Sequence, residues 1–304
     1  MKRASAINQN WQVFGASVTG SVHRKTGRTN EDALLWHHNS TSVHGPILAI
    51  SDGHGSSKCF RSQLGSKFAT EAAVTQLLWA RSALQDNLIA FKRDAKEQLT
   101  RQIHRSWRES VLDDIHNTPF THAEKSALIL KSGKEAWREV LTNPLIAYGA
   151  TLLAVITSAR FVLTLQLGDG DILIVDKSGA VSRVCTASEM QIGEETLSLC
   201  APDANECFIV NFQEVNENSP ALIVLSTDGY SNSFQNEEGF LRVGSDLLAI
   251  LKEEGVDALK KSIPDWLEES SLLGSGDDVT LGVVATPVAF RLDSIVIKEC
   301  DCAR

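Results

Sequence analysis

Apolar and polar residues alternate along parts of the chain as they do in β-strands. Patterns of this kind, or short unbroken apolar runs, cover residues 11–18, 34–36, 47–50 and 222–225. A short apolar run that ends at a turn signal is typical of a buried strand. Two of the runs end in the same way, at Asp52-Gly53 and at Asp228-Gly229. We therefore expect two strands, side by side, that bring Asp52 and Asp228 together at their carboxyl ends.

Between residues 56 and 142 the apolar positions change to helical spacing. Residues recurring every three or four positions predict two helices here, within 60–72 and 84–111. A third helix, 123–141, is predicted to be interrupted near Gly133 and to end before Pro144. Two further helices are expected near the C-terminal end, at 247–251 and 256–267.

Strand patterns return after the helices. They cover residues 151–156, 161–167, 172–175 and 279–285. Tight turns join the first three, which predicts a three-stranded meander. Residues 23–33 are expected to form a polar loop, and 176–220 loops and edge structure. Strands, then helices, then strands again indicate an α+β chain with antiparallel sheets rather than alternating βαβ units.

The bulk composition sets limits on partners. The chain has 304 residues, 43% of them hydrophobic, and a formal net charge of -9 without a basic stripe. This balance argues against nucleic acid or an anionic membrane as the main partner. No apolar run approaches the ~20 residues that span a bilayer, and the first five residues lack the apolar stretch of a secretory signal. We expect a cytoplasmic protein that is a monomer.

Six cysteines occur without the spacing of a zinc site, and reduced thiols are the simplest interpretation. Cys300 and Cys302 flank Asp301, and could bind a soft metal, form a disulfide or belong to a frayed tail.

Acidic residues gather at the predicted strand edges. They are Glu31, Asp32, Asp52, Asp169, Asp228, Asp277 and Asp278. A single Asp-Gly pair is often only a turn residue that caps its own backbone. Acidic residues from five segments at strand edges of one domain favour a bound cation, because crowded carboxylates repel and hard divalent ions prefer oxygen ligands. The stretch that begins at Gly168 is not an EF-hand, since the glycine and glutamate required later in that loop are missing.

Six motifs occur in a fixed order: Asn30-Glu31-Asp32-Ala33, Asp52-Gly53-His54-Gly55, Gly149-Ala150-Thr151-Leu152, Gly168-Asp169, Ser226-Thr227-Asp228-Gly229 and Gly276-Asp277-Asp278-Val279-Thr280. In this order the chain resembles the metal-dependent serine/threonine protein phosphatases of type 2C, bacterial branch. The resemblance implies a four-layer α/β/β/α sandwich of two antiparallel sheets flanked by helices. It places the catalytic domain at residues 11–287, with 1–10 and 288–304 as terminal extensions.

The resemblance also implies an activity. Phosphoserine and phosphothreonine in proteins, placed there by a serine/threonine kinase, would be hydrolysed by a hydroxide that bridges two Mn²⁺ or Mg²⁺ ions. Asp52 would bridge the ions and the carbonyl of Gly53 would bind one of them. Asp228 and Asp277 would hold the other ion, and Asp169 a possible third. Glu31 and Asp32 would act mostly through metal-bound waters.

His54 would be the general acid that protonates the leaving oxygen, or alternatively a turn histidine that caps nearby backbone. Phosphate binding falls to Arg28, although its spacing is shorter than in the family and Arg24 and Lys25 are also available. Asp278 stands where asparagine is usual, which adds charge near the ions.

A substrate flap is expected within residues 186–205, including Glu194-Glu195-Thr196. Two rival functions remain: a catalytically weak relative that binds phosphoproteins or kinases, and a metallophosphatase for small molecules.

Overall fold

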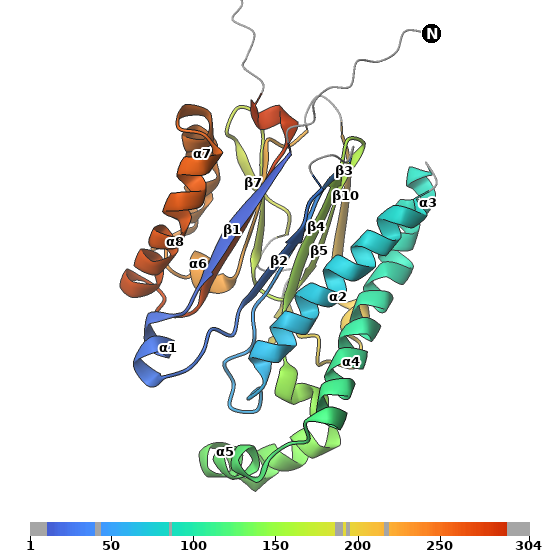
Figure 1. Cartoon of the computed structure of the whole chain (residues 1–304), viewed down its shortest axis with the longest axis vertical. Helices are drawn as coiled ribbons and strands as arrows, with labels where there is room; N and C mark the ends of the chain where they lie inside the picture. The colour runs from blue at the N-terminus through green and yellow to red at the C-terminus, as the bar shows by residue number, and fades with distance from the viewer. Residues whose placement is uncertain are drawn as a thin grey trace, which may run out of the picture.

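Two five-stranded sheets packed face to face form the centre of the molecule, with helices on both outer sides (Figure 1). The computed structural model describes residues 11–39, 44–84, 87–185, 191–192, 195–215 and 219–290, and only the backbone of 191, 192, 195 and 196. The predicted four-layer α/β/β/α arrangement is confirmed.

Every pairing between strands is antiparallel. In spatial order the first sheet contains β1 (Gln12–Val18), β12 (Val279–Ala285), β11 (Leu222–Ser226), β6 (Asp171–Val175) and β7 (Val181–Arg183). The second contains β10 (Ile209–Glu214), β5 (Phe161–Leu167), β4 (Leu152–Ser158), β3 (His44–Ser51) and β2 (Ala33–His37). A separate ladder joins β8 (Gln191–Ile192) to β9 (Glu195–Thr196), within the expected flap, whereas Glu194 lies outside the described residues.

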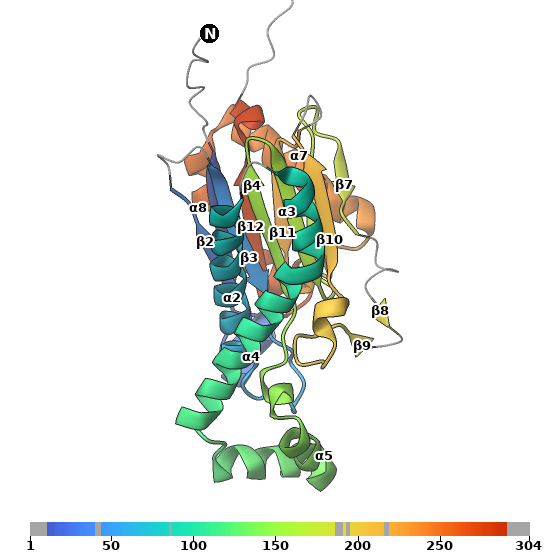
Figure 2. The same cartoon turned by 90° about the vertical axis from the view of Figure 1, so that its right-hand side faces the viewer.

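The outer layers are helical. The second sheet is covered by α2 (Ser62–Ala83), α3 (Leu88–Asp94), the π-helix η1 (Ala95–Leu99) and α4 (Thr100–Asn117), as Figure 2 shows. The first sheet is covered by α7 (Glu237–Glu253) and α8 (Val256–Leu273). Beyond one end of the sandwich lies α5 (His122–Thr142). Short helices complete the chain: α1 (Ser21–Thr26), α6 (Asp228–Ser231) and the 3₁₀ helices η2 (Pro144–Tyr148), η4 (Ala204–Glu206) and η5 (Pro287–Phe290).

Three apolar cores hold the four layers together. Residues such as Leu48, Ile223 and Val284 fill the space between the sheets. A second core joins the second sheet to α2 and α4, and a third joins the first sheet to α7 and α8. Because the central strands bury both faces, every residue of β4, β5, β11 and β12 is buried. This burial explains why these strands are apolar runs rather than strict alternations.

The predicted three-stranded meander is wrong. β4 pairs with β5 in the second sheet, but β6 pairs with β11 in the first. The chain crosses between the sheets at Gly168-Asp169-Gly170, where Gly168 has φ 101°, a conformation that favours glycine. The crossing places Asp169 at the end of the sandwich between the two sheets.

The predicted helices are real but their bounds differ. The first runs to Ala83 and the second is one continuous stack of α3, η1 and α4. α5 is kinked at Gly133, as expected, with φ 86° and ψ 173°. The segment predicted as a polar loop, 23–33, overlaps the end of α1, whose six residues show no apolar period. Among the described residues, none of the helices is both long and apolar enough to cross a bilayer.

Candidate metal centre

Asp52 and Asp228 lie together at the end of the sandwich where α1 and α6 are found (Figure 1). The strands that precede them, β3 and β11, belong to opposite sheets, so the predicted side-by-side pairing is wrong, although the predicted meeting of the two carboxyl groups is correct. The two carboxyl groups are close enough for their interaction to raise the pKa of Asp52. Two such groups repel each other unless one holds a proton or a cation lies between them.

The glycine of each Asp-Gly pair is required by packing. A Cβ on Gly53 would lie 2.6 Å from the carbonyl oxygen of Glu31, and a Cβ on Gly229 would lie 2.1 Å from that of Asp278. These backbone contacts tie the Asp52 and Asp228 turns to the segments that contain the other acidic residues. The repeated Asp-Gly signature therefore brings several carboxylates to one place.

Asp32 is buried beneath this pair. Its Oδ2 accepts hydrogen bonds from Oγ1 of Thr280 at 2.6 Å and from Oγ1 of Thr227 at 2.9 Å. Both threonines stand in the motifs given above, but sequence reasoning assigned them no role, since a hydroxyl next to apolar residues gives no distinctive pattern. They fix one oxygen of Asp32, whose charge acts on Asp52 and which is itself affected by the charge of Asp228.

The remaining predicted carboxylates lie around the same point. The charge of Asp169 acts on both His54 and Asp228, and the charge of Asp277 acts on Asp52 and Asp228. Asp277 is the most accessible of them, with a side chain that is 56% exposed. The five aspartates predicted from five separate segments are therefore brought together.

The electrostatics of this cluster fit a bound cation. Burial, followed by the charges of neighbouring carboxylates, raises the pKa of Asp52 well above its usual value. Burial is also the main cause of the raised pKa of Asp32 and of Asp228, against hydrogen bonds that oppose it. Without a cation these groups cannot all be ionised at once. An all-oxygen donor set of this charge suits Mg²⁺ or Mn²⁺.

A hollow of about 270 Å³ opens beside the cluster. It is lined by Val22, His23, Arg28, Glu31, Asp52, Gly53, Gly55, Ser275, Gly276, Asp277 and Asp278. Nη2 of Arg28 donates to both carboxylate oxygens of Glu31, at 2.9 and 2.7 Å. Arg24 instead pairs with Glu268 of α8 at 3.5 Å. Of the two arginines considered for phosphate binding, Arg28 is the one that faces the hollow.

His54 is half-buried close to the aspartates. Its backbone N–H donates to the carbonyl oxygen of Gly149 at 3.0 Å. Burial lowers the pKa of its imidazole, and the carboxylate of Asp169 works in the opposite direction. An imidazole of lowered pKa releases its proton more readily, and a nearby carboxylate helps to retain that proton until it is needed.

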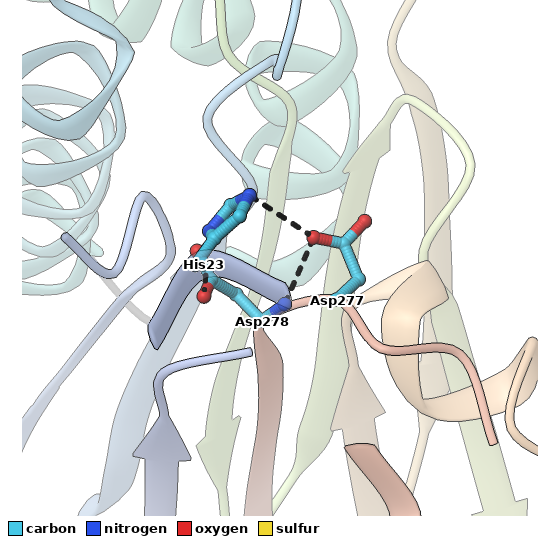
Figure 3. A group of neighbouring side chains, drawn as sticks. All are labelled: His23, Asp277 and Asp278. Atoms are coloured by element: carbon cyan, nitrogen blue, oxygen red, sulfur yellow. Dashed lines mark hydrogen bonds and ion pairs between the residues drawn. The ribbon is translucent and has the colours of Figure 1, made fainter. Parts of the chain in front are cut away.

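Sequence reasoning missed His23, which lies in α1 beside Asp277 and Asp278 (Figure 3). Asp278 is almost fully buried, with 3% of its side chain exposed. Its Oδ1 accepts from the backbone N–H of Gly20 and its Oδ2 from that of Glu31, each at 2.6 Å. A single histidine in a polar stretch has no pattern to reveal it. The available signal was the unusual aspartate at 278, a buried charge that requires partners.

In the metal-free protein we expect the contribution of the aspartate cluster to folding stability to grow as pH falls through the raised pKa values of its carboxyl groups. A carboxyl group with a raised folded pKa gives stability that is complete below its unfolded pKa, near 3.8 for aspartate, and is lost as pH rises through the folded pKa. One extra bound proton corresponds to about 1.4 kcal/mol per pH unit. Urea unfolding in EDTA at several pH values, for wild type and Asp52→Asn, measures the effect.

The comparison with Asp52→Asn is needed because buried histidines act in the opposite direction in both proteins. Burial lowers the pKa of His54 and of His104, so the need to protonate these two side chains makes the folded protein less stable in acid. The unfolding free energy of wild type minus that of Asp52→Asn should increase as pH falls. A difference that does not change with pH would show that Asp52 and its neighbours are not holding a proton.

The chain belongs to the protein phosphatase 2C family, whose model matches residues 19–268. No curated protein matches it significantly. The family that the sequence motifs predicted is therefore confirmed.

Solved structures with the same fold include three bacterial phosphatases. The catalytic domain of the serine/threonine protein phosphatase PstP, crystallised with two manganese ions, is 15% identical, with a TM-score of 0.52, over 91% of this chain and 98% of that one. Stp1 from Staphylococcus aureus is 15% identical, with a TM-score of 0.55 over 94% and 98%. PppA, a regulatory component of the type VI secretion system in Pseudomonas aeruginosa, is 13% identical, with a TM-score of 0.55 over 91% and 97%.

Proposed function

We propose that this chain is a metal-dependent phosphatase that hydrolyses phosphoserine and phosphothreonine in proteins. The observation that supports it most strongly is that five aspartates, from five segments, lie close enough for their charges to interact, and that two of them, Asp52 and Asp277, line an open hollow in a chain of this family. The raised pKa values of Asp52, Asp32 and Asp228 support a site built for cations rather than a structural network. The manganese ions of the PstP structure are consistent with this choice.

In this proposal Asp52 and the Gly53 carbonyl would be ligands of the divalent ions, Mn²⁺ or Mg²⁺. Asp228 and Asp277 would also hold an ion, and Asp169 would hold a third where one is bound. When bound, such ions activate water at neutral pH and neutralise charge on the phosphoryl oxygens. Two threonines hold one oxygen of Asp32 in place. Asp32 would therefore orient the carboxyl groups next to it.

The chain's own residues would bind the phosphoryl group and move the proton. Arg28 presents its guanidinium group at the rim of the hollow, and Glu31 holds it there at 2.7 Å. A planar guanidinium matches two phosphate oxygens at once. His54 would give a proton to the departing serine or threonine oxygen.

Cysteine chemistry has no support in the described part of the chain. Cys59, the thiol nearest to His54, is 7% exposed, and burial raises its pKa to about 12. A thiol with this pKa stays protonated at neutral pH and is a poor nucleophile. Cys300 and Cys302 lie outside the described residues.

Metal-free protein is expected to be inactive on p-nitrophenyl phosphate and on a phosphothreonine peptide, and Mn²⁺ or Mg²⁺ to restore turnover of both. Prior alkylation of thiols should not change this activity. Calorimetric titration with Mn²⁺ in parallel separates the rival functions: no binding favours a non-catalytic relative. Rapid turnover of sugar phosphates but not of phosphopeptides would point to a small-molecule phosphatase.

A further inference from the structure

His23 is held firmly at the rim of the hollow by the packing of α1. The backbone N–H of Ser21 donates to Oγ of Ser271 at 2.9 Å, and that of Val22 donates to the carbonyl oxygen of Gly276 at 2.9 Å. His23 itself is 7% exposed. A buried imidazole between two carboxylates, on a helix anchored by its own backbone, has little freedom to turn away.

The two nitrogens of His23 face different aspartates (Figure 3). Nδ1 lies 3.0 Å from Oδ1 of Asp278, yet the angle is not that of a hydrogen bond, and this buried nitrogen has no hydrogen-bond partner. Nε2 lies 3.8 Å from Oδ1 of Asp277, on the side of the hollow. That distance is too long for a direct hydrogen bond.

The separation between Nε2 and Oδ1 of Asp277 matches that of two ligands on one ion. Ligand atoms lie about 2.1 Å from a small divalent ion. Two such atoms are therefore about 3.0 Å apart at a right angle and about 4.2 Å apart on opposite sides, and 3.8 Å lies within this range. One ligand atom from each of His23, Asp277 and Asp278 lies within 4.8 Å of the others.

We propose that Nε2 of His23 is a nitrogen ligand of the ion that Asp277 holds, and that Asp278 orients the imidazole through Nδ1. Histidines that bind metals usually direct their second nitrogen at a carboxylate or carbonyl oxygen, which fixes the tautomer. Asp278 lies 3.0 Å from Nδ1, so a small rotation of the imidazole on metal binding is enough for it to accept a hydrogen bond there. This assignment rests on the proposed function, since it concerns an ion of the same centre, but it adds a ligand of a different chemical type.

The assignment also explains why aspartate replaces the usual asparagine at position 278. An asparagine would supply a weaker acceptor for Nδ1–H than a carboxylate does. A nitrogen ligand changes the choice of ion, because imidazole suits transition metals whereas Mg²⁺ prefers oxygen. His23 therefore biases the centre toward transition-metal ions over Mg²⁺.

Pulsed EPR of the Mn²⁺-loaded full-length protein tests the proposal directly. We expect nitrogen hyperfine coupling from a bound imidazole in wild type, a changed pattern when histidine alone is labelled with ¹⁵N, and loss of the coupling in His23→Gln. The matched control is His54→Gln, which removes a histidine close to the same aspartates and should retain the coupling. Labelled wild type and this control keep the test valid even where His23→Gln does not fold.

Metal titrations of the same samples measure which ion each protein prefers. His23→Gln should bind Mn²⁺ about tenfold more weakly, with Mg²⁺ binding unchanged within about twofold. Active protein that binds Mn²⁺ without nitrogen coupling would overturn this inference and leave the proposed function standing. Coupling that survives in His23→Gln would overturn it as well. Protein that neither binds Mn²⁺ nor turns over a phosphopeptide would overturn both.

Discussion

Replacing Asp52 by asparagine is expected to lower kcat/KM on a phosphothreonine peptide by at least about 1,000-fold at saturating Mn²⁺, through loss of a charged ligand from the centre of the site. Asparagine keeps the shape of the side chain. The contacts between the Asp52 backbone and Thr151, 3.0 Å from the amide and 2.8 Å to the carbonyl, do not involve the carboxyl group. Steady-state kinetics with a metal titration measures the loss.

The stability of this variant should change in the opposite direction. Without metal, wild type buries Asp52 among like charges, and an amide removes that cost, so metal-free Asp52→Asn should melt no lower than wild type. Mn²⁺ at 100 times its Kd stabilises wild type by about 2.7 kcal/mol, and the variant should lose most of this gain. Asp113→Asn, an exposed change on α4, is the control and should alter neither property. Full activity in Asp52→Asn would contradict the proposed centre.

Much of the fold could be predicted because its buried strands are apolar runs with clear ends. Both Asp-Gly turns were predicted at the correct positions, because β3 and β11 each contain five or more adjacent buried residues before the turn. The pairing of strands was harder. Nothing local distinguishes a hairpin from a crossing at Gly168, because both are short turns with glycine, and only the packing of two sheets decides between them.

The candidate site, like the fold, could be predicted only in part. Its aspartates lie at the ends of strands and were predicted, but the residues that support them were not. Thr280 and Thr227 lie 53 positions apart and meet only through the pairing of β11 with β12. α1 forms because its backbone bonds to Ser271 and Gly276, which are distant in sequence, and not because its own residues favour a helix. His23 therefore became visible as a site residue only with the tertiary structure.

The second large effect is expected at Arg61, which joins the loop after His54 to the helices beyond it. Nε of Arg61 donates to Oε1 of Glu124 at 2.7 Å, and Nη1 donates to the hydroxyl of Tyr148 at 2.7 Å and to Oδ2 of Asp114 at 3.2 Å. Its side chain is only 7% exposed, while the two carboxylates are each about a quarter exposed. The guanidinium also lies 4.9 Å from the centre of the Phe120 ring.

Arg61→Met should lower the free energy of unfolding by about 3 kcal/mol, because it leaves two largely covered carboxylates without the buried guanidinium that pairs with them. Glu124→Gln should cost less, since glutamine can keep the capping contact with Thr121 at the start of α5. The control is Arg105→Met, the same substitution at an exposed i, i+4 pair on α4, for which we expect no measurable change. Urea unfolding of the three variants measures these costs.

The location of Arg61 links this stability to the metal centre. Its backbone N–H donates to the carbonyl oxygen of Ala147 at 2.7 Å, two residues before Gly149, which in turn accepts from His54. Loosening the network should therefore disturb the loop of Asp52 and His54 and weaken Mn²⁺ binding together with folding. If Arg61→Met unfolded at the same urea concentration as Arg105→Met, the buried ion pairs would contribute nothing net to stability. The position of the loop that contains Asp52 and His54 would then depend on the two sheets alone.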